Sequence, residues 1–550
     1  MIERLLETWL NKANERSFQI PFCHWLAYTG HTVVHMSRHC AMEMGKDILA
    51  IDPQGVPCAY QLKGVDGGRM TIGEWRRELG QQIHPLVSER IVHPSITSPQ
   101  HHRSFIVING DFDEEVHRAI DDFNQTNARS GYPERKVETI VKGQLFQAFK
   151  ELQADFWATN LHNLRSYLEL LTEDGCGQLP KAKLCSLFES ALPFEAKVEK
   201  GRKKKRTVGE CTRAFAGCAI ICASAISQYT GQSNHLAEFE AWTLFFSYTL
   251  ALTEKWKLPL SKVKFALDVA QEAIYSSLGR LCDELMKREV YVQGTALTLL
   301  ADAAVYRVRI THLLGLMGIY GFWRMSLIRD GKETVDEARD AFLRKFCAEK
   351  SKLIWLWGEY AIPQILALNF FASRFTPQRE TEGRYFSLIH GITRQNHPKS
   401  EHALANPYYD PEMILPHLLG LEGKPLEDSF AGSSYYLEGL MHLAVRTNYK
   451  QSMKMVFPEI TRIGFHSYVP EEPWQFFLLS NRGKGTSHTR FLKPPHKWEK
   501  LRTEAEECEG KDIPAIMKRF PLLYSCLLMV MPHRVSASGL RWLATEMDKG

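Results

Sequence analysis

The sequence lacks paired cysteine motifs. Its 12 cysteines are scattered and no two form a CxxC pair, which argues against a zinc ribbon and against a disulfide scaffold. Cys211, Cys218 and Cys222 recur at the spacing of one helix face, so we expect them to be buried thiols. This cysteine usage is typical of a protein of the reducing cytoplasm.

The sequence also lacks a P-loop. The pattern GxxxxGK[ST] does not occur, since Gly423-Lys424 is followed by proline and Gly483-Lys484 has no glycine at the upstream position. We therefore expect no ATP hydrolysis of this kind from the chain itself. If its activity is coupled to a nucleoside triphosphate, a partner protein must supply that NTPase activity or regulation.

No stretch has both the length and the lack of polar residues of a typical membrane span. Residues 353–375 are strongly apolar but contain Glu359, and residues 235–252 contain Glu238. Both stretches are predicted to be buried helices. The first residues predict an amphipathic helix rather than a signal peptide, so we expect a cytoplasmic protein with no membrane partner.

Length and charge set broad limits. A chain of 550 residues is long enough for roughly two to four domains with separate cores. The formal net charge of +5 is small for this length. Any affinity for nucleic acid must therefore come from a local basic patch rather than from the chain as a whole.

Residues 47–63 predict a β-hairpin. The runs 47–51 and 56–62 are apolar-rich and of strand length, and Asp52-Pro53-Gln54-Gly55 separates them. Proline fixes φ at the first central turn position, and Gly55 accepts the left-handed conformation that follows. The pattern predicts a type I turn closed by a glycine bulge, which is a three-residue hairpin loop.

The bulge decides which side chains share a face of this hairpin. With it, Asp52 faces Val56, and counting back along the strands places Asp47 opposite Gln61. Lys63 then lies two residues further along on the same face. A two-residue loop would instead turn Gln61 and Lys63 away from Asp47. The turn therefore predicts a convergent site.

An acid, an amide and a lysine on one face suit a divalent cation beside a phosphate. Mg²⁺ prefers oxygen ligands and keeps several waters, so we expect Asp47 to be its main ligand and Gln61 a second one. Lys63 would stabilise the charge that develops on the phosphate or position the attacking water. Glu43, just before the strand, is a further candidate ligand and catalytic carboxylate. The expected cofactor is Mg²⁺, with Mn²⁺ as a substitute.

Asp47 followed by Gln61-Leu62-Lys63 resembles the PD-(D/E)xK nuclease superfamily, in the Mrr-like branch of restriction endonucleases where glutamine replaces the second acid. The order of the expected elements is similar to the core of that superfamily. These elements are a helix over 17–27, strands over 30–34, 47–51 and 56–62, a helix over 71–83, a strand over 104–110 and a helix over 114–123.

The chain departs from that family pattern at two positions. Lys46 separates Gly45 from Asp47, whereas Mrr-like proteins usually have Gly-Asp at the start of the metal strand. The first helix of the family often carries a glutamate, and the nearest match in this helix is Gln19. Pro21 is tolerable only if it falls in the first turn of that helix.

The resemblance implies a Mg²⁺-dependent DNA endonuclease with a role in restriction or defence against foreign DNA. The expected partner is double-stranded DNA. Because cutting both strands of a duplex usually needs two sites, the resemblance also implies a homodimer or a larger assembly.

The expected fold is an α/β restriction-endonuclease-like domain followed by a large, mainly α-helical region. We expect four parts with different sequence character. They are the nuclease domain at 1–150, a helical connector with a basic run at 151–210, an all-α domain at 211–395 and a mainly α C-terminal domain at 396–550.

Two basic segments are candidate nucleic-acid contacts. The first is the run Arg202, Lys203, Lys204, Lys205 and Arg206, which is either a solvated linker or a loop that holds phosphates. The second contains Lys484, Arg490 and Lys493 with aromatic residues between them, a composition that can grip a backbone and stack a base. An exposed loop with a few packed aromatics explains the second segment equally well.

Three other interpretations of the chain remain open. The hairpin at 47–63 can be an ordinary surface hairpin in which Lys63 pairs with Asp47. The N-terminal fold can be an inactive nuclease that binds nucleic acid without cutting it. The chain can also be a helical scaffold subunit of a multi-protein defence complex.

Overall fold

The structure is a computed structural model of the chain. It describes residues 2–36, 46–65, 68–91, 93, 95–96, 101–153, 161–199, 202–287, 300–400, 403–421, 431–479, 486–490 and 497–549.

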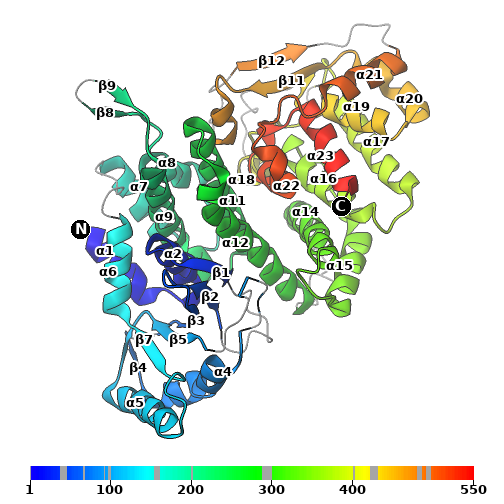
Figure 1. Ribbon diagram of the computed structural model, residues 1–550. Helices are drawn as coiled ribbons and strands as arrows, with labels where there is room; N and C mark the ends of the chain where they lie inside the picture. The colour runs from blue at the N-terminus through cyan, green and yellow to red at the C-terminus, as the bar shows by residue number, and fades with distance from the viewer. Residues whose placement is uncertain are drawn as a thin grey trace. The chain divides into compact units, whose positions relative to one another are not determined.

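The chain divides into two compact units, Met1–Ser276 and Ser277–Gly550. We call them unit 1 and unit 2. Unit 1 contains a sheet with helices around it, and unit 2 is mostly helical (Figure 1). A mixed α/β region followed by a mainly helical one is the coarse fold class that the sequence predicts.

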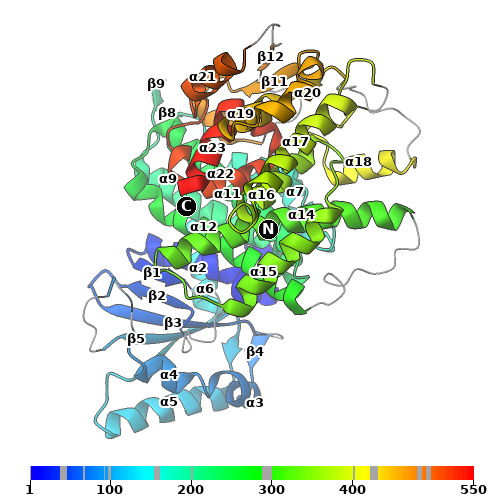
Figure 2. The ribbon, with the colours of Figure 1, turned by 90° about the vertical axis from the view of Figure 1, so that its right-hand side faces the viewer.

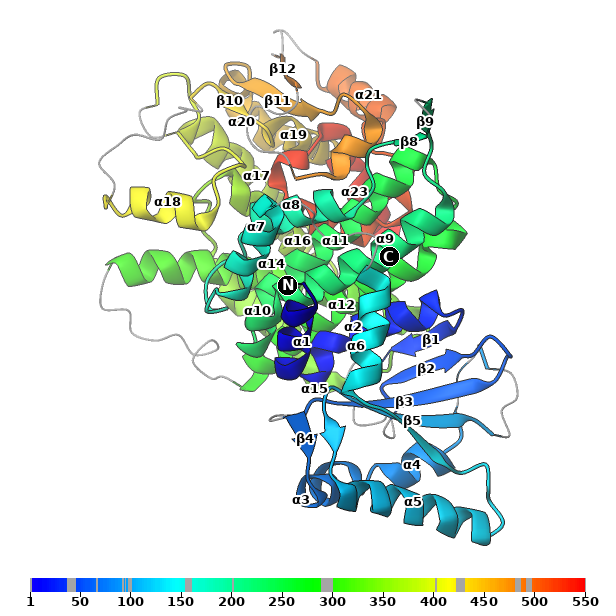
Figure 3. The ribbon, with the colours of Figure 1, turned by 90° about the vertical axis from the view of Figure 1, so that its left-hand side faces the viewer.

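Unit 1 contains a five-stranded mixed sheet in the order β1-β2-β3-β5-β7 (Figure 3). The first three strands pair antiparallel, whereas β5 runs parallel to β3 and β7 parallel to β5. Parallel neighbours need a crossover connection, and helices lie in both connections. The strands are β1 (Thr32–Met36), β2 (Ile48–Ile51), β3 (Pro57–Lys63), β5 (Arg103–Ile108) and β7 (Val137–Ile140).

The turn between β2 and β3 has the predicted geometry. The Gly55 amide donates to the Asp52 carbonyl at 2.9 Å and the Asp52 amide to the Val56 carbonyl at 2.9 Å. Gly55 has φ +86°, the left-handed conformation that glycine adopts without steric cost. The Asp52 carboxylate also accepts the amides of Gln54 and Val56. The glycine bulge and its three-residue loop are confirmed.

Helices cover both faces of the sheet, with α2 and α6 on one side and α4 and α5 on the other (Figure 2). On the α2 side, Tyr60 of β3 stacks on Phe105 of β5 with ring centroids 4.8 Å apart. On the other side, Leu49, Ala59 and other buried apolar residues form a core with the helices. The helices are α2 (Glu15–Tyr28), α4 (Ile83–Ser88), α5 (Glu114–Arg129) and α6 (Lys142–Gln153).

The first helix of the expected core begins earlier than the sequence suggests. Asn14 caps α2, because its side-chain oxygen accepts the Ser17 amide at 3.0 Å, so the helix begins at Glu15 rather than at Ser17. Pro21 then lies inside the helix and not in its first turn. The expectation for Pro21 was wrong. Buried side chains on both sides of Pro21 hold the helix against the sheet.

The connection between β3 and β5 is not one continuous α-helix. Thr71 and Glu74 form a capping box at the start of α3 (Ile72–Glu74), and the chain then widens into a π-helical turn, η2 (Trp75–Leu79). The Gly80 amide donates to the Trp75 carbonyl at 2.7 Å. Trp75 and Leu79 are both buried in the core. The helix expected over 71–83 is therefore broken, and α4 begins only at Ile83.

The other elements of unit 1 are helices and short strands. Cys211, Cys218 and Cys222 lie on α9 and are buried, as predicted. Within the described residues, α9 is the one helix long and apolar enough to cross a membrane, but 72% of it is buried inside the protein. The elements are α1 (Ile2–Lys12), β4 (Arg69–Met70), β6 (Asp111–Phe112), α7 (Leu161–Leu171), α8 (Lys181–Ala191), β8 (Lys197–Glu199), β9 (Arg202–Lys204), α9 (Val208–Ala225), α10 (Ser227–Gly231), α11 (His235–Trp256) and α12 (Leu260–Lys287), which continues into unit 2.

Unit 2 consists of helices and a three-stranded sheet in the order β10-β11-β12. The apolar helix α22 is buried from Leu523 to Val530. The elements are α14 (Leu300–Arg329), α15 (Glu337–Lys350), η3 (Ser351–Leu353), η4 (Glu359–Ala361), α16 (Ile362–Ala372), α17 (Gln378–Gln395), α18 (Pro411–Leu418), β10 (Ser433–Ser434), α19 (Leu437–Arg446), α20 (Lys450–Ile460), β11 (Gly464–Val469), η5 (Pro473–Phe477), β12 (Thr486–Arg490), α21 (Trp498–Cys508), η6 (Met517–Arg519), α22 (Pro521–Val530), η7 (Pro532–Arg534) and α23 (Ala537–Lys549).

A buried carboxyl group connects three segments of unit 2. Glu359 is fully buried. Its side chain accepts the Ser434 hydroxyl at 2.5 Å and the Tyr435 amide at 3.0 Å, and its own amide donates to the Ala405 carbonyl. Burial raises the pKa of Glu359 to about 7, although the two hydrogen bonds oppose this. The group therefore favours its protonated form in the folded protein.

We predict that Glu359→Gln removes a pH-dependent loss of stability. The stability that protonated Glu359 contributes is present below its ordinary pKa of 4.5 and is lost as the pH rises through about 7. Glutamine keeps the shape and stays neutral, so the variant should exceed wild type by at most about 3 kcal/mol at pH 8.5 and match it near pH 5. Thermal unfolding of both proteins across this range measures the difference. An equal difference at both pH values would contradict the assignment.

Candidate functional site

Asp47 directly precedes β2, and Gln61 lies near the end of β3, where the two side chains meet. The pairing of Ile48 with Tyr60 and the Asp47 amide bond to the Tyr60 carbonyl at 2.8 Å place Asp47 opposite Gln61, as predicted. The Gln61 Nε2 donates to Asp47 Oδ2 at 2.7 Å, and the Leu62 amide donates to the same oxygen at 2.7 Å. The half-buried carboxylate is thus held on the hairpin by two hydrogen bonds.

The amide oxygen of Gln61, unlike its amide nitrogen, has no hydrogen-bond partner among the described residues. Gln61 is 8% exposed, and its Oε1 is buried without a hydrogen-bond partner in the part of the chain that the structure describes. A buried amide oxygen without a donor is costly, so each such atom calls for a physical reason. A hard cation is one such reason, because amide and carboxylate oxygens are its preferred ligands.

Lys63 lies on the same face as Asp47 and Gln61 but pairs with neither. Its Nζ lies 3.0 Å from Glu78 Oε2 of the π-helical turn, with the two side chains 27% and 31% exposed. Burial lowers the pKa of Lys63, but the hydrogen bond to Glu78 and the fields of Glu15, Glu78 and Asp47 outweigh burial and leave the pKa raised. Lys63 therefore keeps its proton. The simple Lys63–Asp47 pair of an ordinary hairpin is not the arrangement found.

Glu15, at the start of α2, is the acidic residue of the first helix that reaches the site. Its Oε2 accepts the amide of Gly64 at 3.1 Å, directly after Lys63, and its field acts on Lys63. Gln19, the expected match in this helix, is buried, and its Nε2 has no hydrogen-bond partner among the described residues. The acidic residue lies one turn before the position that the sequence suggested.

Lys46, the residue between Gly45 and Asp47, has a structural role. It is 6% exposed, and its Nζ donates to the Pro85 carbonyl of α4 at 2.9 Å. Burial lowers its pKa to about 8, although the field of Glu89 acts in the opposite direction. The buried ammonium joins the start of β2 to α4 and so helps to fix Asp47.

The remaining candidate ligand, Glu43, lies outside the described residues. Within those residues, no group of three or more His, Cys, Asp or Glu side chains is arranged to hold a metal ion. The structure places the Gln61 amide against the Asp47 carboxylate through the amide nitrogen, with Glu15 near the end of β3.

The first basic run forms part of a hairpin rather than an unstructured linker. Arg202, Lys203 and Lys204 make up β9, which pairs antiparallel with β8, with Lys197 opposite Lys204. Lys204 and Lys205 are exposed. The Arg206 Nε donates to the Glu195 carbonyl at 3.0 Å, so this arginine holds the base of the hairpin.

The second basic segment is described only in part. Arg490 lies on β12 of unit 2, paired with Phe465 of β11. Lys484 and Lys493 lie outside the described residues. No common basic surface can be assigned to these three residues.

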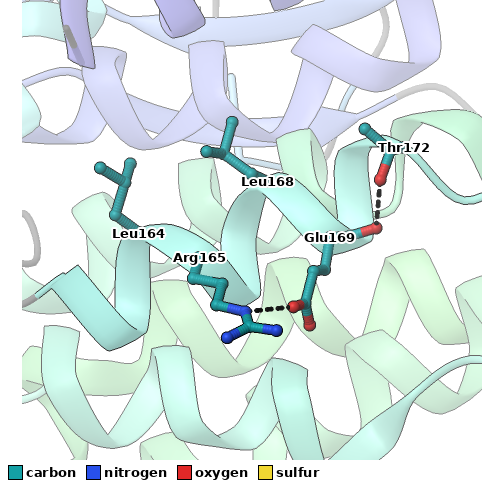
Figure 4. Close-up of a pocket in the computed structure, with 5 residues that line it drawn as sticks. All are labelled: Leu164, Arg165, Leu168, Glu169 and Thr172. Carbon is teal, nitrogen blue, oxygen red and sulfur yellow. Dashed lines mark hydrogen bonds and ion pairs between the residues drawn. The ribbon is translucent and has the colours of Figure 1, made fainter.

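A shallow hollow on α7 offers no comparable chemistry. Leu164 and Leu168 lie on one side of the helix and Arg165 and Glu169 on the other (Figure 4). The Arg165 Nε lies 2.7 Å from Glu169 Oε1, and Glu169 also pairs with Lys183 at 3.0 Å. Its charged side chains neutralise one another, so we assign it no function.

No protein-family model, no curated protein and no solved structure matches the chain. The function must therefore be argued from the geometry of the site itself.

Sequence reasoning missed Glu15 and Glu78 as neighbours of Lys63. Glu15 precedes the helix start expected at Ser17, and the cap at Asn14 was the available signal. Glu78 lies on the polar side of the helix expected over 71–83, where a carboxylate has many possible partners. Nothing in the local pattern connects it with Lys63.

We predict that Asp47→Ala loosens the end of β3, whereas Asp47→Asn does not. Both hydrogen bonds end on one oxygen of Asp47, and an asparagine oxygen can accept both. Alanine leaves the Leu62 amide without its acceptor, at a cost of about 2 kcal/mol. Hydrogen exchange of β3 peptides, followed by mass spectrometry, should be roughly 30-fold faster in the alanine variant. Equal exchange in the two variants would show that the carboxylate does not hold the strand.

Proposed function

We propose that the chain is a metal-dependent nuclease that hydrolyses phosphodiester bonds of DNA at a site in unit 1. The observation that carries the proposal is the convergence of Asp47, Gln61 and Lys63 on one face of the β2–β3 hairpin. The buried Oε1 of Gln61 adds to it, because that atom lacks a donor within the described residues while Nε2 of the same amide binds the Asp47 carboxylate.

The order of the elements supports a PD-(D/E)xK nuclease fold for residues 15–140. Helix α2 is followed by the antiparallel strands β1, β2 and β3, a helical crossover, β5 parallel to β3, and α5. This is the order that the resemblance implies. Asp47 lies just before β2, and Gln61 and Lys63 lie on β3.

Asp47 and Gln61 would hold Mg²⁺ or Mn²⁺ through their side-chain oxygens. When bound, the cation supplies a Lewis acid that polarises the phosphate and favours ionisation of water. Glu43 is a further candidate ligand. The donor set, a carboxylate and an amide oxygen, fits a hard cation that keeps several waters.

Lys63 would act as a fixed positive charge. Its ammonium keeps its proton at neutral pH because three carboxylates surround it, so its role is to stabilise negative charge that develops on the phosphate oxygens. In the overall reaction a water oxygen forms a bond to phosphorus and one P–O ester bond breaks. The departing oxygen takes up a proton, which gives an alcohol and a phosphate monoester.

The proposal extends to the biological role of the protein. We propose a cytoplasmic effector of restriction or antiviral defence that acts on double-stranded DNA as a homodimer or larger assembly. The helices of unit 2 would bind a regulatory partner or sense the trigger.

A second candidate function is nucleic-acid binding without cleavage. It is favoured by the lack of a three-ligand acidic group among the described residues and by the engagement of Lys63 with Glu78. In this case the chain would be a binding or scaffold subunit of a multi-protein complex.

We predict that the full chain cleaves plasmid DNA with Mg²⁺ or Mn²⁺, and that Asp47→Asn and Lys63→Met each lower the rate at least about 100-fold. Gel analysis of nicked and linear plasmid measures the rate, and chelation by EDTA should abolish it. Cutting by both variants at the wild-type rate would exclude this site. DNA binding by an intact wild type that does not cut would support the second candidate.

We predict that the β8–β9 hairpin binds phosphates of the DNA backbone. Replacing Lys204 and Lys205 by glutamine should weaken DNA binding and reduce the slope of log affinity against log salt by about 2, because each lysine would neutralise one phosphate. Filter binding at several salt concentrations measures both quantities. An unchanged slope would identify the hairpin as a solvated connector.

A further inference from the structure

We propose that Glu78 is a positioning residue that holds the Lys63 ammonium over the face of the hairpin where Asp47 and Gln61 meet. This inference rests on the proposed nuclease function, and it names the part of the site that the β-hairpin alone does not provide.

The geometry assigns the two oxygens of Glu78 to different partners. Oε2 lies 3.0 Å from Lys63 Nζ, and Oε1 accepts the Arg77 Nη2 at 2.8 Å. Arg77 is exposed, with 69% of its side chain accessible, so it holds the outer oxygen while the inner one faces Lys63. A carboxylate fixed at one oxygen loses less rotamer freedom when it pairs through the other.

The π-helical turn gives Glu78 a fixed backbone. Trp75 and Leu79 on this turn are buried in the core of unit 1, and the Gly80 amide closes the wide turn on the Trp75 carbonyl. Added bulk at Gly80 would come within 3.3 Å of the Arg76 backbone. Short π-helical turns often occur at functional sites because they redirect a side chain that an α-helix would place elsewhere.

The charges around Lys63 explain why a dedicated partner is needed. The ammonium experiences carboxylates from three elements, which are Glu15 of α2, Asp47 before β2 and Glu78 of η2. Without Glu78, the carboxylates that still act on the ammonium are Glu15 and Asp47, and a shift toward Asp47 would place it against the carboxylate that is needed for the cation. Glu78 thus holds the Lys63 ammonium near Asp47 and Gln61 and keeps it from pairing with Asp47 directly.

The experiment compares wild type, Glu78→Gln, Glu78→Asp and the control Glu115→Gln in the full chain. Glu115 is an exposed carboxylate on α5, so its removal changes the net charge equally and leaves the site intact. Two quantities are measured for each protein. They are kcat and KM for plasmid cleavage, and the acetylation rate of Lys63 with trace acetic anhydride at a single pH, read by mass spectrometry.

We expect acetic anhydride to acetylate Lys63 at least roughly threefold faster in the Glu78→Gln variant than in wild type at pH 9. We expect kcat to fall about tenfold with KM nearly unchanged. Glu78→Asp should restore part of both effects, and Glu115→Gln should match wild type.

Unchanged acetylation of Lys63 and an unchanged kcat in Glu78→Gln would overturn the proposal. If no protein in the set cleaves DNA, the nuclease function fails, while the acetylation rates still report whether Glu78 holds Lys63. The two failures are therefore distinguishable.

Discussion

The left-handed conformation of Gly55 is the constraint on which the site depends. Side chains alternate between the two faces of a strand, so a shift of one residue in the pairing of β2 with β3 would move Gln61 and Lys63 to the opposite face. The bulge at Gly55 sets this pairing. One permissive residue in a surface turn thus decides whether an acid and an amide in the strands face each other.

The hairpin could be predicted from sequence because its determinants are local. Asp52, Pro53 and Gly55 specify the turn within four residues, and the register follows by counting. The environment of Lys63 could not be predicted in this way. Glu78 reaches it only because the crossover widens into a π-helical turn, and that widening depends on how Trp75 and Leu79 pack in the core.

The start of the first helix and the structure of the basic run also differ from what the sequence suggests. The first helix begins at Glu15 because Asn14 and Ser17 form a cap, and that cap brings Glu15 to the end of β3 in place of the expected Gln19. The basic run at 202–206 lacks apolar periodicity, which suggested a linker. Its backbone nevertheless pairs with β8, because the hydrogen bonds of a two-stranded ribbon are made by the backbone and need no apolar pattern of side chains.

The candidate site draws on one early stretch of the chain. The site in unit 1 uses residues between Glu15 and Glu78, and the sheet that supports it is complete at Ile140. In unit 2 the segment of Glu359 is joined to Ala405 and Ser434, and Tyr436 binds the carbonyl of Pro532. Because a chain emerges from the ribosome N-terminus first and domains fold as they emerge, unit 1 can form while unit 2 is still incomplete. The face of the hairpin that carries Asp47, Gln61 and Lys63 can therefore be in place before unit 2 has been synthesised.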